Sequence, residues 1–92
     1  MDELTLRQTV AENLVYYRRR QGMTQAALAE TLNYSDKSVS KWERGEGLPD
    51  ITVLCRLAEY YGITVNDLIG EDGERIAVHA KKKTHRLRLL IM

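Results

Sequence analysis

The sequence predicts a single all-α domain, and three observations support that fold class. The chain has 92 residues, which leaves room for one domain only. Apolar residues recur at helical spacing in consecutive segments, and glycine, proline or a capping residue separates each segment from the next. No stretch alternates apolar and polar residues as a half-buried strand does. We therefore expect a bundle of five helices followed by a tail.

The first helix is expected over residues 5–21. Four apolar side chains share one of its faces at i, i+4, i+8 and i+11, namely Leu6, Val10, Leu14 and Tyr17. Gly22 ends this segment, because glycine adopts the left-handed conformation at a helix C-terminus without steric cost.

The next two helices are expected to be short and joined by a turn of about three residues. Thr24 is a good N-cap for the first of them, and Asn33 ends it because Asn tolerates the left-handed conformation. Ser35 caps the following helix, whose first turn contains Asp36 near the positive end of the helix dipole. This arrangement is a helix-turn-helix, and Ala29 supplies the small residue needed where the two helices cross.

The third helix has two distinct faces. Val39 and Trp42 lie three residues apart and are expected to point into the core, so Trp42 is interpreted as a packing residue rather than a platform for stacked bases. The outer face is polar and consists of Asp36, Lys37, Ser40, Lys41 and Arg44. Such a helix fits the major groove of B-DNA, where polar side chains reach the base edges.

Two further helices complete the predicted bundle. Asp50 is expected to cap a fourth helix, which Gly62 ends. Its predicted apolar stripe consists of Ile51, Leu54, Leu57, Ala58 and Tyr61. A short fifth helix follows Thr64, which lies three residues before Asp67 as in a capping box. In this fifth helix Leu68 and Ile69 are expected to face inward, before Gly70 ends it.

The distribution of charge is more informative than the net charge of +1. From Arg18 to Arg44 the chain has six basic and three acidic residues, and from Arg75 to its end it has six basic residues and none acidic. Residues 1–10 have no apolar run like that of a secretory signal. The single cysteine, Cys55, excludes an internal disulfide and is expected to be a small packing residue. These features favour a reducing, cytoplasmic location.

Several short motifs, in order and at fixed spacing, resemble the helix-turn-helix family of the phage Cro and repressor proteins, also called xenobiotic-response-element-like regulators. The motifs are Gly22-Met23-Thr24-Gln25, Leu28-Ala29, Ser35, the block from Val39 to Glu46, Pro49-Asp50, Leu57-Ala58 and Asp67-Leu68-Ile69-Gly70. The resemblance implies a five-helix bundle of the lambda-repressor-like type over residues 4–70. It also implies a transcriptional regulator that binds double-stranded operator DNA, usually as a homodimer, and needs no cofactor.

The resemblance also implies a role for particular residues, with residues 35–44 as the recognition helix. The positions that would contact phosphate are Gln25, which would also brace the recognition helix, and Ser35, Ser38 and Arg44. The positions that would contact bases are Asp36, Lys37 and, for a base or a phosphate, Lys41. Asp36 is less usual there, and it either accepts from a cytosine amino group or only helps to cap the helix. Arg18 and Glu43 match a pair that joins the first and third helices by a salt bridge. Asn33 replaces the glycine that is common at the turn.

Other classes of function have less support. A protein-interaction module, such as an antitoxin or an assembly adaptor, is the alternative, but its third helix would be depleted of basic residues. No pairing of catalytic groups supports an enzyme. His79 and His85 have no neighbouring cysteine or carboxylate cluster at zinc-ligand spacing, so no metal site is expected.

The tail, residues 71–92, changes from acidic to strongly basic and then to apolar. Basic residues before an apolar run are typical of the cytoplasmic side of a membrane helix, although such a helix needs about 20 apolar residues. One hypothesis is therefore a juxtamembrane segment that tethers the regulator to a membrane if the native chain continues past Met92. The alternatives are a disordered basic tail, contact with flanking phosphates, or an extra helix in a dimer.

Overall fold

A computed structural model describes residues 2–70, and within that range the chain folds into five α-helices without a strand. The helices are α1 (Glu3–Arg20), α2 (Gln25–Leu32), α3 (Asp36–Glu43), α4 (Ile51–Tyr61) and α5 (Val65–Ile69). The predicted all-α class and the number of helices before the tail are confirmed. The hypotheses about residues 71–92 lie outside the described residues. In the described part, none of the helices has the length and hydropathy that crossing a membrane requires.

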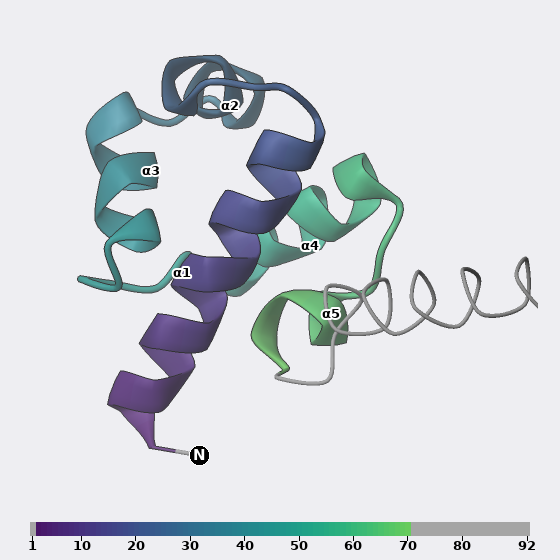
Figure 1. The fold of residues 1–92 in the computed structure, drawn as a ribbon. Coiled ribbons are helices and arrows are strands. Elements are labelled where there is room, and N and C mark those ends of the chain that lie inside the picture. Colours follow the sequence, from purple (N-terminus) through teal and green to yellow (C-terminus); the bar gives the residue numbers. More distant parts are fainter. Residues whose placement is uncertain (1, 71–92) are drawn as a thin grey trace, which may run out of the picture.

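Helix α1 crosses the middle of the molecule, with α2 and α3 on one side and α4 and α5 on the other (Figure 1). It packs against both α3 and α5, while α2 packs on α3 and α4 packs on α5. Because α1 contacts elements on both sides, it is the element that fixes the helix-turn-helix pair relative to the rest of the bundle.

The core draws on all five helices. Its buried members are Val10, Leu14, Tyr17, Leu28, Ala29, Leu32, Val39, Trp42, Val53, Leu54, Leu57, Ala58 and Leu68. Two predictions about α4 are wrong. Ile51 is 65% exposed, because the inner face of α4 is centred on Leu54 and Leu57 and Ile51 lies to one side of it. Cys55 is exposed rather than packed, because it falls on the outer side of the same helix.

The N-terminus of every described helix is capped by a side chain. Thr24, Ser35 and Asp50 each accept a hydrogen bond from the backbone N–H three residues on, as predicted. Thr64 and Asp67 form the predicted capping box. Asp2 was not predicted as a cap; its carboxylate accepts from the Thr5 N–H at 2.7 Å, and α1 therefore begins at Glu3, two residues earlier than expected.

The turn between α2 and α3 depends on one residue with a positive φ. Asn33 has φ 60° and ψ 43°, the left-handed conformation that the sequence predicted. The next N–H, that of Tyr34, donates to the Ala29 carbonyl at 2.8 Å and closes the end of α2. Two residues later α3 begins, so this turn determines the direction in which α3 leaves α2.

Candidate nucleic-acid interface

Helix α3 presents one face to the core and one to solvent. Val39 is 1% exposed and Trp42 is 8% exposed, so Trp42 is a packing residue, as the sequence predicted. The ring of Tyr34 packs edge-on against Trp42 with the centroids 5.3 Å apart. The exposed side of α3 includes Asp36, Lys37 and Lys41.

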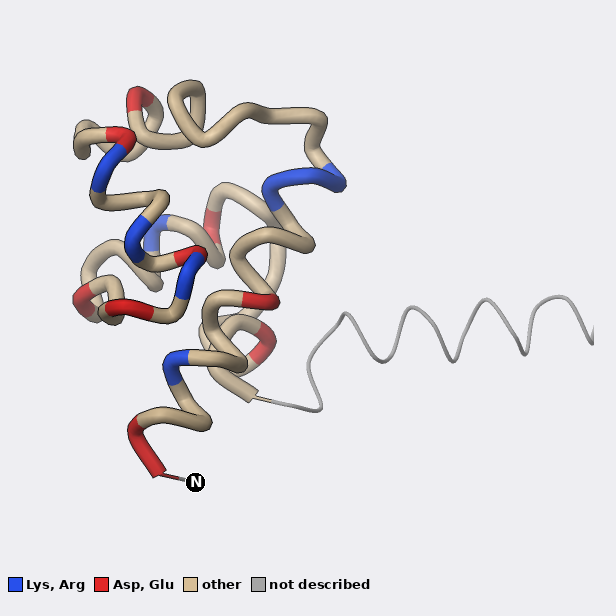
Figure 2. The backbone as a smooth tube through the Cα atoms, turned by 60° about the vertical axis from the view of Figure 1, so that its left-hand side comes forward, with Lys and Arg blue, Asp and Glu red and all other residues tan. Residues whose placement is uncertain are grey.

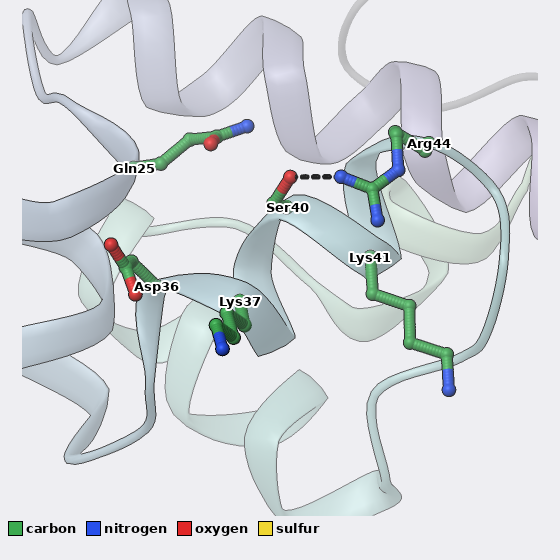
Figure 3. Close-up of a pocket in the computed structure, with 6 residues that line it drawn as sticks. All are labelled: Gln25, Asp36, Lys37, Ser40, Lys41 and Arg44. Atoms are coloured by element: carbon green, nitrogen blue, oxygen red, sulfur yellow. Dashed lines mark hydrogen bonds between the residues drawn. The ribbon is translucent and has the colours of Figure 1, made fainter.

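This exposed side and the start of α2 form a shallow concavity of about 440 Å³. The residues that line it are Gln25, Asp36, Lys37, Ser40, Lys41 and Arg44 (Figure 3). Five of them are among the DNA-contacting residues implied by the sequence, and the sixth, Ser40, was predicted on the same outer face but without a contact to DNA. The structure therefore brings most of the implied residues onto one open surface. In Figure 2 basic residues recur along α3, and a second basic group lies at the C-terminal end of α1.

Ser35 and Ser38 lie together at the N-terminus of α3 rather than in the concavity. The Ser35 Oγ accepts from the Ser38 N–H at 3.2 Å, and the two hydroxyl oxygens are 3.1 Å apart. Both residues therefore stabilise the first turn of α3. Their hydroxyl groups lie beside backbone N–H groups at a helix N-terminus, where anions are favoured.

A bidentate ion pair joins α1 to the end of α3. Arg18 donates from Nε to Glu43 Oε2 at 2.7 Å and from Nη2 to Glu43 Oε1 at 2.9 Å. The side chains of Arg18 and Glu43 are only 12% and 3% exposed. Arg18 also donates to the Met23 carbonyl at 2.8 Å, which fixes the guanidinium to the loop before α2. The hydrogen bond with Glu43 raises the pKa of Arg18 above its ordinary value, so the guanidinium stays charged.

Gln25 joins the start of α2 to the same carboxylate. Its Nε2 donates to Glu43 Oε1 at 3.0 Å. An amide nitrogen has two N–H groups, so this bond uses only one of them. Gln25 also lines the concavity, where a second donor on the same nitrogen can meet an acceptor on a ligand.

Arg44 follows the last residue of α3 and makes contacts within the chain. It donates to the Ser40 Oγ and to the Glu46 carboxylate. The hydrogen bond from Arg44 lowers the pKa of the Glu46 carboxyl, and the charge of Lys41 contributes in the same direction. The family resemblance implied a phosphate contact for Arg44 and no role for Glu46.

Two contacts that support the helix-turn-helix pair were not predicted. The Tyr34 hydroxyl donates to Asp50 Oδ2 at 3.1 Å, which ties the turn between α2 and α3 to the N-cap of α4. Arg56 of α4 donates to the Leu32 carbonyl at 2.8 Å and to the Thr31 carbonyl at 3.2 Å, at the negative end of α2. Both contacts link residues far apart in the sequence, so no local pattern indicates them.

Comparison with known proteins identifies the family. A family model described as helix-turn-helix matches residues 14–68, more than half of the chain. The chain belongs to the helix-turn-helix family of transcriptional regulators. The Cro- and repressor-like assignment made from the sequence is therefore confirmed, and members of this family are regulators rather than enzymes. In the described residues, no group of three or more His, Cys, Asp or Glu side chains is placed to hold a metal ion.

Three relatives of this helix-turn-helix protein illustrate the similarity. The transcriptional activator BcrR of Enterococcus faecalis is 36% identical over 66% of this chain and 30% of its own length. The cryptic phage CTXphi transcriptional repressor RstR of Vibrio cholerae is 30% identical over 79% of this chain and 69% of its own. The solved structure of the SOS-response transcriptional repressor LexA from Eubacterium rectale aligns with a TM-score of 0.70 at 26% identity, covering 74% of this chain and 72% of that one. This chain thus spans less than a third of BcrR.

Proposed function

We propose that this helix-turn-helix protein is a sequence-specific regulator that places residues 35–44, with α3 at their centre, in the major groove of operator DNA. The exposed polar and basic side of α3, lining an open concavity with the start of α2, is the observation that carries the proposal. A shallow surface of this kind suits a broad polar ligand and offers little enclosure to a small molecule. The retained Lys37, Lys41 and Arg44 favour DNA over a protein-interaction adaptor.

The proposed contacts divide by chemistry. Lys37 and Lys41 can donate to the guanine O6 and N7 acceptors, whereas Asp36 can only accept and suits the amino group of cytosine. Four residues at the edges of the surface would bind phosphate and fix the docking register, namely Gln25, Ser35, Ser38 and Arg44. The ion pair of Arg18 with Glu43 would hold α3 at the angle this docking requires.

We further propose that two copies bind a two-fold symmetric operator. Selection of bound duplexes from a random pool tests both parts of the proposal. The expected result is an enriched motif with two inverted half-sites one helical turn apart, or a multiple of a turn. Enrichment of a single half-site would reject the dimer. Absence of any enriched sequence, together with absence of binding to duplex DNA, would reject DNA recognition and favour the adaptor.

Replacing Lys37 or Lys41 by alanine is expected to weaken operator binding by about 1–3 kcal/mol for a lost base contact, while the domain stays folded. Loss of a phosphate contact would instead reduce the salt slope by about one unit. Affinity should be measured across a range of salt concentrations, with circular dichroism to check folding. Arg19→Ala is a matched control, because it removes one positive charge from an exposed residue in the last turn of α1, outside the concavity. Equal affinity in the wild type and both lysine variants would reject the assignment of α3.

A further inference from the structure

The loop after α3 holds an acidic side chain against the basic end of the proposed DNA-binding surface. The Arg44 Nε donates a hydrogen bond to the Glu46 carboxylate, and the two oppositely charged side chains thereby form an ion pair. The same guanidinium donates from Nη1 to the Ser40 Oγ. One N–H group of the Arg44 guanidinium thus already donates to an anionic oxygen of the chain itself. A DNA phosphate would offer the same kind of acceptor.

The backbone of this loop is fixed, so the position of Glu46 follows from how α3 ends. Gly45 has φ +74°, a conformation that glycine adopts without strain. Its N–H donates to the Trp42 carbonyl at 3.1 Å, and the Glu46 N–H donates to the Lys41 carbonyl at 3.0 Å. These two bonds are those of a Schellman motif at the end of α3. The backbone from which the Glu46 side chain projects is therefore held in place directly after the end of α3.

The same loop also lies against Lys41. A Cβ placed on Gly47 would be 3.3 Å from the Lys41 Cε, so the stem of Lys41 passes along the loop. The charge of Lys41 also helps to lower the pKa of the Glu46 carboxyl, after the larger effect of Arg44. One carboxylate is thus within electrostatic reach of two of the three basic side chains on the proposed surface.

We propose that Glu46 is a built-in counterion that competes with DNA phosphate for Arg44 and thereby sets the affinity and salt dependence of DNA binding. This inference rests on the proposed function. A phosphate that binds Arg44 must displace the Glu46 carboxylate, and the displaced carboxylate remains nearby and repels it. The side chains of Arg44 and Glu46 are 57% and 52% exposed, so this exchange requires no change in the core.

Glu46→Gln tests the proposal because it removes the charge and keeps the size of the side chain. Binding to a duplex of unrelated sequence and to the selected operator should be measured between about 50 and 200 mM salt. The variant is expected to bind about two- to fivefold more tightly at low salt, the range for an exposed ion pair. The gain should shrink as salt screens the charges. Glu59→Gln, an exposed residue of α4, is the matched control for net charge and should change affinity by less than half as much.

A double-mutant cycle separates competition for Arg44 from general repulsion. Arg44→Gln should weaken binding, and in that background Glu46→Gln should bring little or no gain. A gain that persists in full without Arg44, or one that only equals that of Glu59→Gln, would overturn the inference while leaving the proposed function intact. A wild-type protein that binds neither duplex would instead reject the proposed function, and this inference with it.

Discussion

The Glu43 carboxylate is almost fully buried and accepts hydrogen bonds from three donor groups. Its side chain is 3% exposed, and it accepts two hydrogen bonds from Arg18 and one from Gln25. Burying a charge is costly unless it is paired and hydrogen-bonded, and here both conditions are met. Because the three residues come from α1, α2 and α3, this single carboxylate fixes the relative positions of the helices that form the proposed interface.

We predict that Arg18 and Glu43 are strongly coupled in stability. Arg18→Ala should lower the free energy of unfolding by about 3 kcal/mol, because it leaves Glu43 buried without a cationic partner. In the double variant Arg18→Ala/Glu43→Ala the cost should be well below the sum of the two single costs. Urea unfolding of the four proteins gives the coupling energy directly.

The chain provides its own control for this measurement. Glu3 and Arg7 form an ion pair at 3.2 Å on the surface of α1, with side chains 69% and 33% exposed. A pair of this kind is worth less than about 0.5 kcal/mol. If the coupling between Arg18 and Glu43 is no larger than the coupling between Glu3 and Arg7, the buried pair does not hold the interface together.

At the scale of elements, the N-terminus of α4 supports the helix-turn-helix pair. Asp50 caps α4 by accepting from the Val53 N–H at 2.9 Å, and its second oxygen accepts from the Tyr34 hydroxyl. The Tyr34 ring in turn packs on Trp42 of α3. One capping carboxylate thus connects α4, the turn after α2, and the inner side of α3.

We predict that protonation of Asp50 lowers the stability of the fold in acid. The hydrogen bond from the Val53 N–H lowers the pKa of Asp50 below its ordinary value of 3.8, and the Tyr34 hydroxyl acts in the same direction. As the pH falls through about 4, the Asp50 carboxylate is protonated in the unfolded chain before it is protonated in the folded chain. The stability that Asp50 contributes is therefore present above this range and is lost below it. Asp50→Asn should change the thermal midpoint at pH 7 only slightly, because Asn is as good an N-cap as Asp and its amide N–H can donate to the Tyr34 hydroxyl oxygen in place of the bond that Tyr34 donates to Asp50.

Thermal unfolding between pH 7 and pH 3 checks this prediction. The loss of stability on acidification should be smaller in Asp50→Asn than in the wild type. Asp2→Asn should have the same kind of effect, because the Thr5 N–H lowers the pKa of Asp2 in the same way. Identical slopes of stability against pH in the wild type and Asp50→Asn would show that the cap does not titrate as proposed.

The helices were predictable because their ends are encoded locally. The caps Thr24, Ser35 and Asp50 and the turn residue Asn33 each act within a few residues of themselves, so sequence spacing alone indicates them. The predictions for Ile51 and Cys55 were wrong because helical periodicity shows which side of a helix is buried but not how far around the helix the buried surface extends. The neighbours of α4 decide where burial ends, and no local pattern describes them.

The arrangement of the candidate site was predictable to the extent that its residues lie on one helix. Asp36, Lys37 and Lys41 follow from the outer face of α3, and the structure places them on the same concavity. The contact between Arg44 and Glu46 depends on how the loop after α3 turns back. The support from Tyr34 depends on a partner 16 residues away. Neither contact can be predicted without the tertiary structure.

At the scale of the whole molecule, α5 closes the bundle although it has only five residues. Leu68 is 0% exposed and belongs to the core. Asn13, a buried polar residue of α1, donates to the Leu68 carbonyl at 2.7 Å. Removing α5 would therefore open the core and leave a buried amide without this acceptor, and each of these losses is unfavourable.

We predict that the described part of the chain is a complete folding unit only when α5 is present. A variant ending at Gly70 should keep a thermal midpoint within a few degrees of the full chain, because the five helices of residues 2–70 already form a shared buried core among themselves. A variant ending at Ile63 should be largely unfolded, because it lacks the buried Leu68 side chain. Loss of one buried leucine side chain costs about 2–5 kcal/mol, which approaches the total stability of so small a core. Leu68→Ala in the full chain should reproduce most of this loss without truncation. Circular dichroism melts of the four proteins decide the matter: a cooperative transition in the variant ending at Ile63, at the midpoint of the full chain, would show that α5 does not close the core.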